Sequence, residues 1–167
     1  MDRSFVDELL NYIDRVHQRT RRVVFCIPSE KLEHSFGEGR FTLGDLLRHI
    51  ASINRYMFVE TASGRSSRYP GHERALADGF EAATQYFENL HAEAMVELRK
   101  LAAEHFAGKC TTPEGSEITV WKWLRAMIEH ECHHRGQIYL HLSTLGVKTP
   151  PLYGLTSEEV KARSVGK

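Results

Sequence analysis

The sequence predicts an all-α fold, a four-helix bundle, and three observations predict it. Four long segments repeat apolar residues every three to four positions, which is typical of a helix with one face in a core. The five prolines lie between or after these segments, where they do not break a helix. No run of alternating apolar and polar residues is long enough to require a β-sheet.

The first two helices have clear start and stop signals. The first is expected from about Ser4 to Phe25, with Pro28 just beyond its end. The second begins at Thr42, because Asp45 three residues later gives the spacing of a capping box, with Asp in place of the usual Glu. Its apolar stripe fades at Ser63–Gly64, which closes the helix.

The third and fourth helices are longer. The third is expected from about Arg74 to His105, although Gly79 weakens its first turns. The fourth runs from Thr119, as its N-cap, to Leu145, and Gly146 supplies the residue that ends it. Its apolar stripe is interrupted in the middle by Glu131 and His134.

Long linkers join these helices, at residues 26–41, 63–73 and 106–118. The middle linker can reach about 36–40 Å when extended, and a twenty-residue helix is about 30 Å long. The second and third helices can therefore run parallel to each other. Residues 112–115 are expected to form a tight turn. Residues 1–167 are expected to form one domain, with the tail 148–167 packed back on its body.

Composition excludes several classes of function. Lys plus Arg and Asp plus Glu each number 22, so the net charge is zero, which disfavours a generic nucleic-acid binder. The longest stretch without charged residues, Gly136 to Val147, is too short to cross a membrane. The three cysteines have no CxxC spacing, and the N-terminus has no apolar signal segment. We therefore expect a cytoplasmic protein that contacts neither nucleic acid nor membrane.

Histidine is the unusual component of this chain. There are ten histidines, and four of them fall between Glu129 and Leu142. His130 and His134 are four residues apart, so they lie on one helical face, one turn apart, close enough to share a metal ion. Their face borders the apolar stripe, where an imidazole needs a partner for each nitrogen. A metal and an outer hydrogen-bond acceptor together provide those partners.

A third ligand is expected from another helix, and His49 is the best candidate. It lies beside the apolar stripe of the second helix, in the same flank position. Three neutral imidazoles leave an open position for water or substrate, as catalytic metal sites do. The expected cofactor is one divalent transition metal per chain, with zinc first and nickel, iron or manganese as alternatives.

Other interpretations of the same residues stay open. A lone histidine such as His49 is more often a polar residue on a helix flank than a ligand. Glu131 is either a proton-transfer group, our candidate catalytic residue, or a buried partner of an arginine. Arg135 and Gln137 are expected to orient ligands, to bind a dimer partner or to have an ordinary surface role. The remaining residues of ligand type are expected to be surface or packing residues: His17, His34, His72, His91, His105, His141, Cys26, Cys110 and Cys132.

Residues 130–134 also match the H-E-x-x-H signature of zinc proteases, in which Glu131 would be the general base. The longer form of that signature needs a glycine and a third histidine where this chain has Gln137 and Leu140. No strand pattern precedes the motif to hold an extended peptide. A protease is therefore the least favoured alternative.

Two motifs together carry a resemblance to a known family. They are Thr42-Leu-Gly-Asp-Leu-Leu-Arg-His49 and His130-x-x-x-His134-Arg135-Gly136-Gln137, followed by Leu145-Gly146. With the chain length and the four-helix plan, they resemble the DinB/YfiT-like superfamily of metalloenzymes across roughly residues 1–150. The resemblance implies an up-down-down-up bundle, a homodimer, and a divalent metal held by His49, His130 and His134.

The resemblance also implies a chemistry. Characterised members activate a low-molecular-weight thiol for S-transfer or isomerisation, while other relatives are described as hydrolases or stress-induced proteins. We therefore expect a metal-dependent enzyme that acts on a small molecule, by thiol S-transfer to a small electrophile first and by hydrolysis second. The alternative from another class is a non-catalytic, stress-related dimeric bundle with a structural or vestigial metal.

Overall fold

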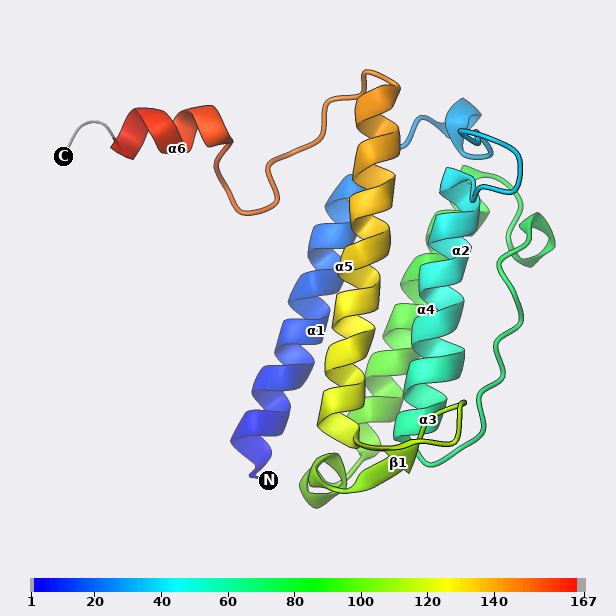
Figure 1. The fold of residues 1–167 in the computed structure, drawn as a ribbon, viewed down its shortest axis with the longest axis vertical. Coiled ribbons are helices and arrows are strands. Elements are labelled where there is room, and N and C mark those ends of the chain that lie inside the picture. Colours follow the sequence, from blue (N-terminus) through cyan, green and yellow to red (C-terminus); the bar gives the residue numbers. More distant parts are fainter. Residues whose placement is uncertain (1, 165–167) are drawn as a thin grey trace.

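Four long helices pack side by side in the computed structural model, which describes residues 2–164 (Figure 1). Their bounds are α1 Arg3–Val24, α2 Leu43–Ile53, α4 Phe80–Lys100 and α5 Val120–Thr144. In Figure 1 the chain ascends in α1 and α5 and descends in α2 and α4, so α2 and α5 face each other with opposite directions. Within the described residues, no helix is both long and apolar enough to cross a membrane.

Shorter elements complete the chain. A π-helical segment and one further helical turn extend α2: η2 Asn54–Val59 and α3 Glu60–Ala62. Three 3₁₀ turns lie in the connections: η1 Ser29–Lys31, η3 Arg74–Leu76 and η4 Ala103–Ala107. The remaining elements are β1 Lys109–Thr111, β2 Glu117–Thr119 and α6 Ser157–Ser164.

The starts of α2 and α5 agree with the sequence patterns, with Thr42 and Thr119 as their N-caps, and the start of the third long helix differs. Asp45 and Thr42 form the predicted capping box, with each side chain accepting from the other's backbone N–H at 2.9–3.0 Å. The predicted start of the third helix at Arg74 was wrong, because α4 begins at Phe80. Gly79 has φ of 85°, a left-handed conformation that separates the 3₁₀ turn from the helix.

The segment before α5 contains a small β-hairpin that the sequence patterns did not predict. β1 and β2 pair antiparallel, with Cys110 opposite Ile118. Strands of three residues contain too few alternations to be recognised in the sequence. The predicted turn at residues 112–115 is confirmed, since the Gly115 N–H donates to the Thr112 carbonyl at 2.8 Å.

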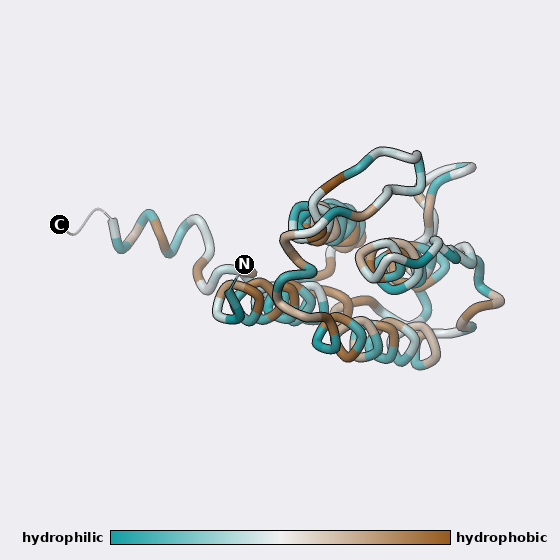
Figure 2. Tube along the Cα trace, turned by 90° about the horizontal axis from the view of Figure 1, so that it is seen from below, coloured by the Kyte–Doolittle hydropathy of each residue, from teal (hydrophilic) through white to brown (hydrophobic). Residues whose placement is uncertain are grey.

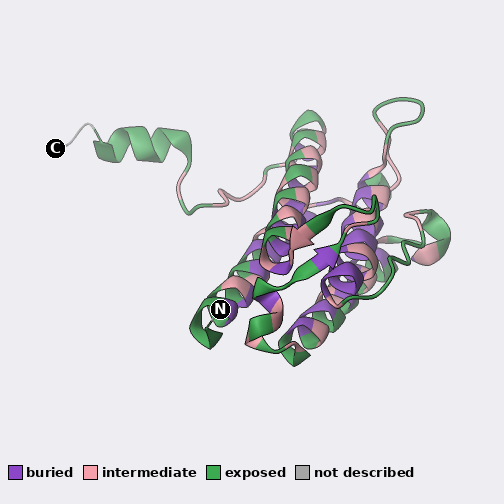
Figure 3. Cartoon of the chain, turned by 60° about the horizontal axis from the view of Figure 1, so that its bottom comes forward, coloured by how far each residue is buried: buried purple, intermediate pink, exposed green. Residues whose placement is uncertain are grey.

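The tail after α5 behaves differently in its two parts. Its first part contacts the bundle, where Arg22 donates to the Pro151 carbonyl and Leu152 packs against buried apolar residues. In contrast, α6 has no buried residue and stands apart from the four helices (Figures 1 and 3). The expected packing of residues 148–167 on the body is therefore not seen for α6.

Buried side chains of the bundle form two apolar clusters along its length, and hydrophobic residues recur on each helix when the bundle is viewed from below (Figure 2). Leu124 of α5 belongs to one cluster, and Ile138 and Leu142 belong to the other. Between them, α5 buries Glu131 and Arg135, which are 3% and 5% exposed. A polar layer thus divides the core at the middle of α5, where the histidines lie.

Candidate metal centre

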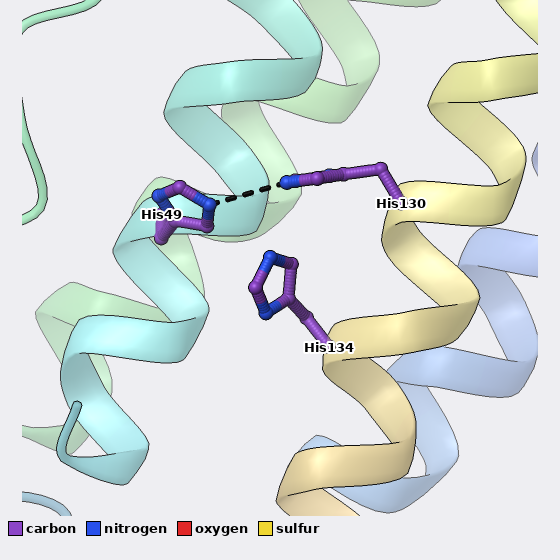
Figure 4. A group of neighbouring side chains, drawn as sticks. All are labelled: His49, His130 and His134. Atoms are coloured by element: carbon purple, nitrogen blue, oxygen red, sulfur yellow. Dashed lines mark hydrogen bonds between the residues drawn. The ribbon is translucent and has the colours of Figure 1, made fainter. Parts of the chain in front are cut away.

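Three histidines from two helices meet in this layer. His49 comes from α2, and His130 and His134 come from successive turns of α5 (Figure 4). Each offers a ring nitrogen, and these three nitrogens all lie within 4.8 Å of one another. Within residues 2–164 this is the one group of three or more potential ligands so closely placed. The i, i+4 spacing and the antiparallel course of α2 and α5 together bring the rings to one point.

The spacing of the ring nitrogens suits a metal ion. The Nε2 atoms of His49 and His130 are 3.1 Å apart, and the His134 ring centroid lies 4.6 Å and 4.4 Å from those of His49 and His130. Zn–N bonds of 2.0–2.1 Å in a tetrahedral site place two ligand nitrogens about 3.3 Å apart. The side chains are therefore close to the arrangement that such a site requires, and all three are half-buried.

Outer hydrogen bonds orient two of the three rings. The His49 Nδ1 atom lies 2.8 Å from the Tyr69 hydroxyl, and the His134 Nδ1 atom lies 2.6 Å from the Gln137 Oε1 atom. An amide oxygen only accepts, so the His134 Nδ1 carries the proton and its Nε2 is free to bind a metal. A metal ligand's second nitrogen is commonly fixed in this way. His130 differs, because its buried Nδ1 has no hydrogen-bond partner within the described residues.

Tyr69 belongs to the connection between α3 and α4, which the sequence patterns treated as a linker. Its hydroxyl also lies 2.9 Å from the His72 Nδ1 atom, so His49, Tyr69 and His72 form a chain of hydrogen bonds. With the His49 Nε2 as a ligand atom, the His49 Nδ1–H donates to Tyr69 and the Tyr69 hydroxyl donates to His72. The prediction of His72 as a surface or packing residue missed this contact. No periodicity in residues 63–79 could have indicated it.

Arg48, the neighbour of His49, fixes this connection to α2. Its side chain is fully buried and forms ion pairs with Glu33 and Asp45, both at 2.9 Å. It also donates to the carbonyls of His72 and Ala77, at 2.8 and 3.1 Å. The guanidinium therefore binds two separate loops to the helix that carries His49, and it holds His72 beside Tyr69.

Burial keeps the three imidazoles neutral at pH 7. Burial, followed by His134 and His72, lowers the pKa of His49 to about 4. Burial, followed by His134, His49 and His133, lowers the pKa of His130 to about 3. Burial also lowers the pKa of His134. A neutral imidazole is the form that binds a metal, so no proton must be removed at neutral pH.

Glu131 lies elsewhere in the layer, away from the nitrogen atoms that converge. Asn54, the first residue of η2, donates to its Oε2 atom at 2.9 Å, and the His17 Nδ1 atom is 4.0 Å from its Oε1 atom. Burial raises the pKa of Glu131 to about 7, against the lowering effect of Arg135. Its contacts with α1 and η2 are those of a structural residue in the core. We therefore set its candidate catalytic role aside.

The other histidines and the cysteines have ordinary surroundings, with one exception. His133 is exposed, and the His105 Nε2 lies 2.6 Å from the Ala62 carbonyl oxygen. His17 and His91 are the exception, because their rings stack in the interior with centroids 3.6 Å apart. The three cysteines carry no disulfide. Gln137, one of whose expected roles was to orient ligands, does contact His134.

Comparison with known proteins places this geometry in context. The sequence matches the family described as the DinB family over residues 1–164. A search of curated proteins gives no match.

Three solved structures share the fold. A DinB-like protein from Bacillus cereus ATCC 10987 has a TM-score of 0.73 and 15% identity, covering 87% of this chain and 95% of that one. YfiT from Bacillus subtilis, described as a probable metal-dependent hydrolase with an unusual four-helix bundle topology, has a TM-score of 0.68 and 15% identity, covering 89% and 91%. The DinB-like protein YjoA from Bacillus subtilis has a TM-score of 0.68 and 13% identity, covering 89% and 99%. At these identities the likeness concerns the fold.

Proposed function

This chain belongs to the DinB family, and we propose that it is a metal-dependent enzyme with a divalent ion held by His49, His130 and His134. The observation that carries the proposal is the convergence of three neutral ring nitrogens from two helices within 4.8 Å. Structural zinc sites use four protein ligands, whereas three leave a coordination position for a reactant. The three-histidine set therefore favours a catalytic site.

The chemistry of the site follows from what a divalent ion supplies when bound: it lowers the pKa of a thiol or of water at its open position. The protein's part is to present three Nε2 atoms in a fixed arrangement. Tyr69 and Gln137 hold the rings of His49 and His134 by their Nδ1 atoms.

We propose thiol S-transfer to a small electrophile as the first reaction, in which the thiol sulfur bonds to the electrophilic carbon, the thiol proton goes to solvent, and the leaving group of that carbon departs with the electron pair of the bond that breaks. The resemblance of the two histidine motifs to thiol-dependent members supports it. Hydrolysis is the second candidate, since the structurally similar YfiT is described as a probable metal-dependent hydrolase. Zinc is the first candidate metal, ahead of nickel, iron and manganese.

The proposal also covers the helix order, the oligomeric state and the cellular location. We propose the up-down-down-up order of the four helices, because this order makes α2 and α5 antiparallel at the site. We also propose a homodimer, as the resemblance implies, which light scattering would measure. The three unpaired cysteines support a cytoplasmic setting.

Two alternatives are less favoured by the geometry. A metalloprotease of the H-E-x-x-H type needs Glu131 as a base at the metal, but Glu131 contacts Asn54 and His17 in the core. A non-catalytic bundle with a structural metal would use the ion to hold the helices together. In that case, metal binding would contribute folding free energy directly.

The experiment compares wild type, His49→Ala and His133→Ala, purified without a nickel column and loaded with zinc, nickel, manganese or iron. Metal content is measured by mass spectrometry. Turnover is measured with a panel of small thiols plus an electrophile, and with a panel of small esters. We expect about one ion per wild-type chain, and loss of the ion and at least about 100-fold of the turnover in His49→Ala.

His133→Ala is the matched control, since His133 is exposed and lies beside His134. It should keep both metal and turnover. Unchanged metal content in His49→Ala would contradict the ligand set. A large fall in the melting temperature of His49→Ala, with no turnover in the loaded wild type, would support the structural alternative instead.

A further inference from the structure

A recess of about 500 Å³ opens between the first long connection and the C-terminal half of α5. Residues of the loop before α2 form one wall, and residues of α5 form the other. The side chains that matter for its chemistry are Phe36, Arg40, Phe41, His134, Gln137 and His141. The volume is within the usual range for a site that takes a small organic molecule.

The recess borders the candidate metal centre at His134, and its residue Phe41 contacts a second histidine, His49. His134 lines it directly, as does Gln137, which accepts the hydrogen bond from the His134 Nδ1. Phe41 lines it from the loop side and packs edge-on against His49, with ring centroids 5.3 Å apart. A molecule in the recess would therefore lie against residues that hold the candidate metal ligands.

Aromatic rings give the recess apolar walls. Phe36 is 40% exposed and packs against the His141 ring at a centroid distance of 4.3 Å. Phe41 provides a second ring. Exposed phenylalanine faces on a loop are costly in water and are covered when a flat apolar group stacks on them. The walls thus select a ligand with a planar apolar body.

Arg40 gives the recess a positive charge without compensation. No carboxylate lines the recess, and within residues 2–164 none lies within 4.0 Å of the Arg40 guanidinium. Glu33 is occupied by Arg48, and Glu38 is exposed on the same loop outside the lining. Burial, followed by His34, lowers the pKa of His141, so that ring adds no charge at pH 7.

We propose that this recess is the substrate site of the metalloenzyme and that it takes a small organic anion with a planar apolar body, whose anionic group pairs with Arg40. The inference rests on the proposed function for its catalytic meaning. The guanidinium offers bidentate hydrogen bonds to a carboxylate, and the phenylalanine rings cover the body. A recess of about 620 Å³ between α5 and the tail is not lined by any of the three histidines.

The test uses 3-phenylpropanoate and its neutral amide as probes, titrated by NMR into the metal-free chain. Wild type, Arg40→Gln and the control Arg163→Gln, which alters an exposed arginine of α6, are compared. We expect wild type to bind the acid more tightly than the amide. Arg40→Gln should lower the affinity for the acid about tenfold and change the affinity for the amide little. Arg163→Gln should match wild type.

Equal affinity for acid and amide in wild type, an unchanged acid affinity in Arg40→Gln, or no binding of either probe would overturn the proposal. A second titration uses chain loaded with Co²⁺, whose paramagnetism should speed the relaxation of the bound probe's protons. Fast relaxation of the probe protons would support binding beside the three histidines. Unchanged relaxation in the Co²⁺-loaded chain would show that the probe binds elsewhere. A chain that binds no metal but binds the acid through Arg40 would overturn the proposed function alone.

Discussion

Two clusters of histidines lie inside the bundle, and they differ in how their rings are turned. Between α2 and α5, the rings of His49, His130 and His134 are inclined to one another by 50° to 79°, and their nitrogens converge. Between α1 and α4, His17 and His91 stack in parallel, with an interplanar angle of 2° and a centroid distance of 3.6 Å. The nitrogens of two parallel rings lie in separate planes and so do not converge on one point.

The surroundings of the two clusters explain this difference. His91 donates toward Asp14 at 3.0 Å, and His17 lies between the rings of His91 and Phe87. Tyr69 and Gln137 instead turn the rings of the first cluster so that their Nε2 atoms face inward. The clusters differ in number and burial as well, because the first has three half-buried imidazoles and the second has a pair whose His17 is 1% exposed. In the first cluster, the outer hydrogen bonds of His49 and His134 decide which of their nitrogen atoms meet.

The largest expected effect is the loss of metal from the first cluster alone. His130→Ala removes one of the three proposed ligands, so the affinity for Zn²⁺ should fall by more than the roughly 10–100-fold that outer partners contribute. His91→Ala is the matched change in the stacked cluster and should leave the affinity unchanged. Competition with a chromogenic chelator measures both. A comparable loss in His91→Ala would show that the stacked pair also takes part in binding.

The stacked cluster should instead affect how the free energy of unfolding depends on pH. Burial, followed by His91 and Arg21, lowers the pKa of His17 from 6.5 to about 2, so the folded chain binds fewer protons than the unfolded chain below pH 6.5. The stability that the neutral ring provides is complete above that pH and declines as the pH falls. Between pH 7 and pH 5 the decline is about 2 kcal/mol.

The variant His17→Phe keeps a ring against Phe87 and removes the titration. Urea unfolding of the metal-free chain at pH 7 and pH 5 gives the free energy of unfolding. We expect the difference between the two pH values to be about 2 kcal/mol smaller in the variant than in wild type. Burial raises the pKa of Glu131, so Glu131 contributes to the pH dependence of the unfolding free energy with the opposite sign. This contribution is present in both wild type and the variant. Equal pH dependence would contradict a neutral, buried His17.

A smaller effect is expected from the outer hydrogen bond that aligns the first cluster. Tyr69→Phe keeps the ring beside His49 and removes the hydroxyl that fixes its Nδ1. The affinity for Zn²⁺ should fall about tenfold, because the ring of His49 is then free to turn. Tyr12→Phe, which alters a hydroxyl on an exposed ring, is the control and should have no effect. Equal Zn²⁺ affinities of the two variants would contradict the orienting role of Tyr69.

The sequence predicted the helices well because their signals are local. The capping box of Thr42 and Asp45 and the closing Gly146 depend on residues a few positions apart, and both features are present. The errors occurred where local signals are weak. Gly79 separates a 3₁₀ turn from α4, and the hairpin before α5 has strands of three residues. Neither has enough residues for a period to be recognised.

The site was predictable in part for the same reason. His130 and His134 lie on one helical face by their spacing, and the flank position of His49 suggested a partner on another helix. Glu131 is next to His130 in the sequence, yet it contacts Asn54 and His17. A residue one position along a helix turns by about 100°, so proximity in the sequence does not place it at the same site.

The sequence by itself determined four amphipathic helices and the positions of three histidines on their flanks. Only the tertiary structure decided which nitrogen of the His49 ring faces inward. That choice depends on Tyr69, which arrives from a loop without periodicity and is held there through Arg48 and His72. Helical periodicity is a property of neighbouring residues, whereas the orientation of a ring is set by whatever the fold brings against it. The recess at Arg40 has the same origin, since a loop and α5 form it together.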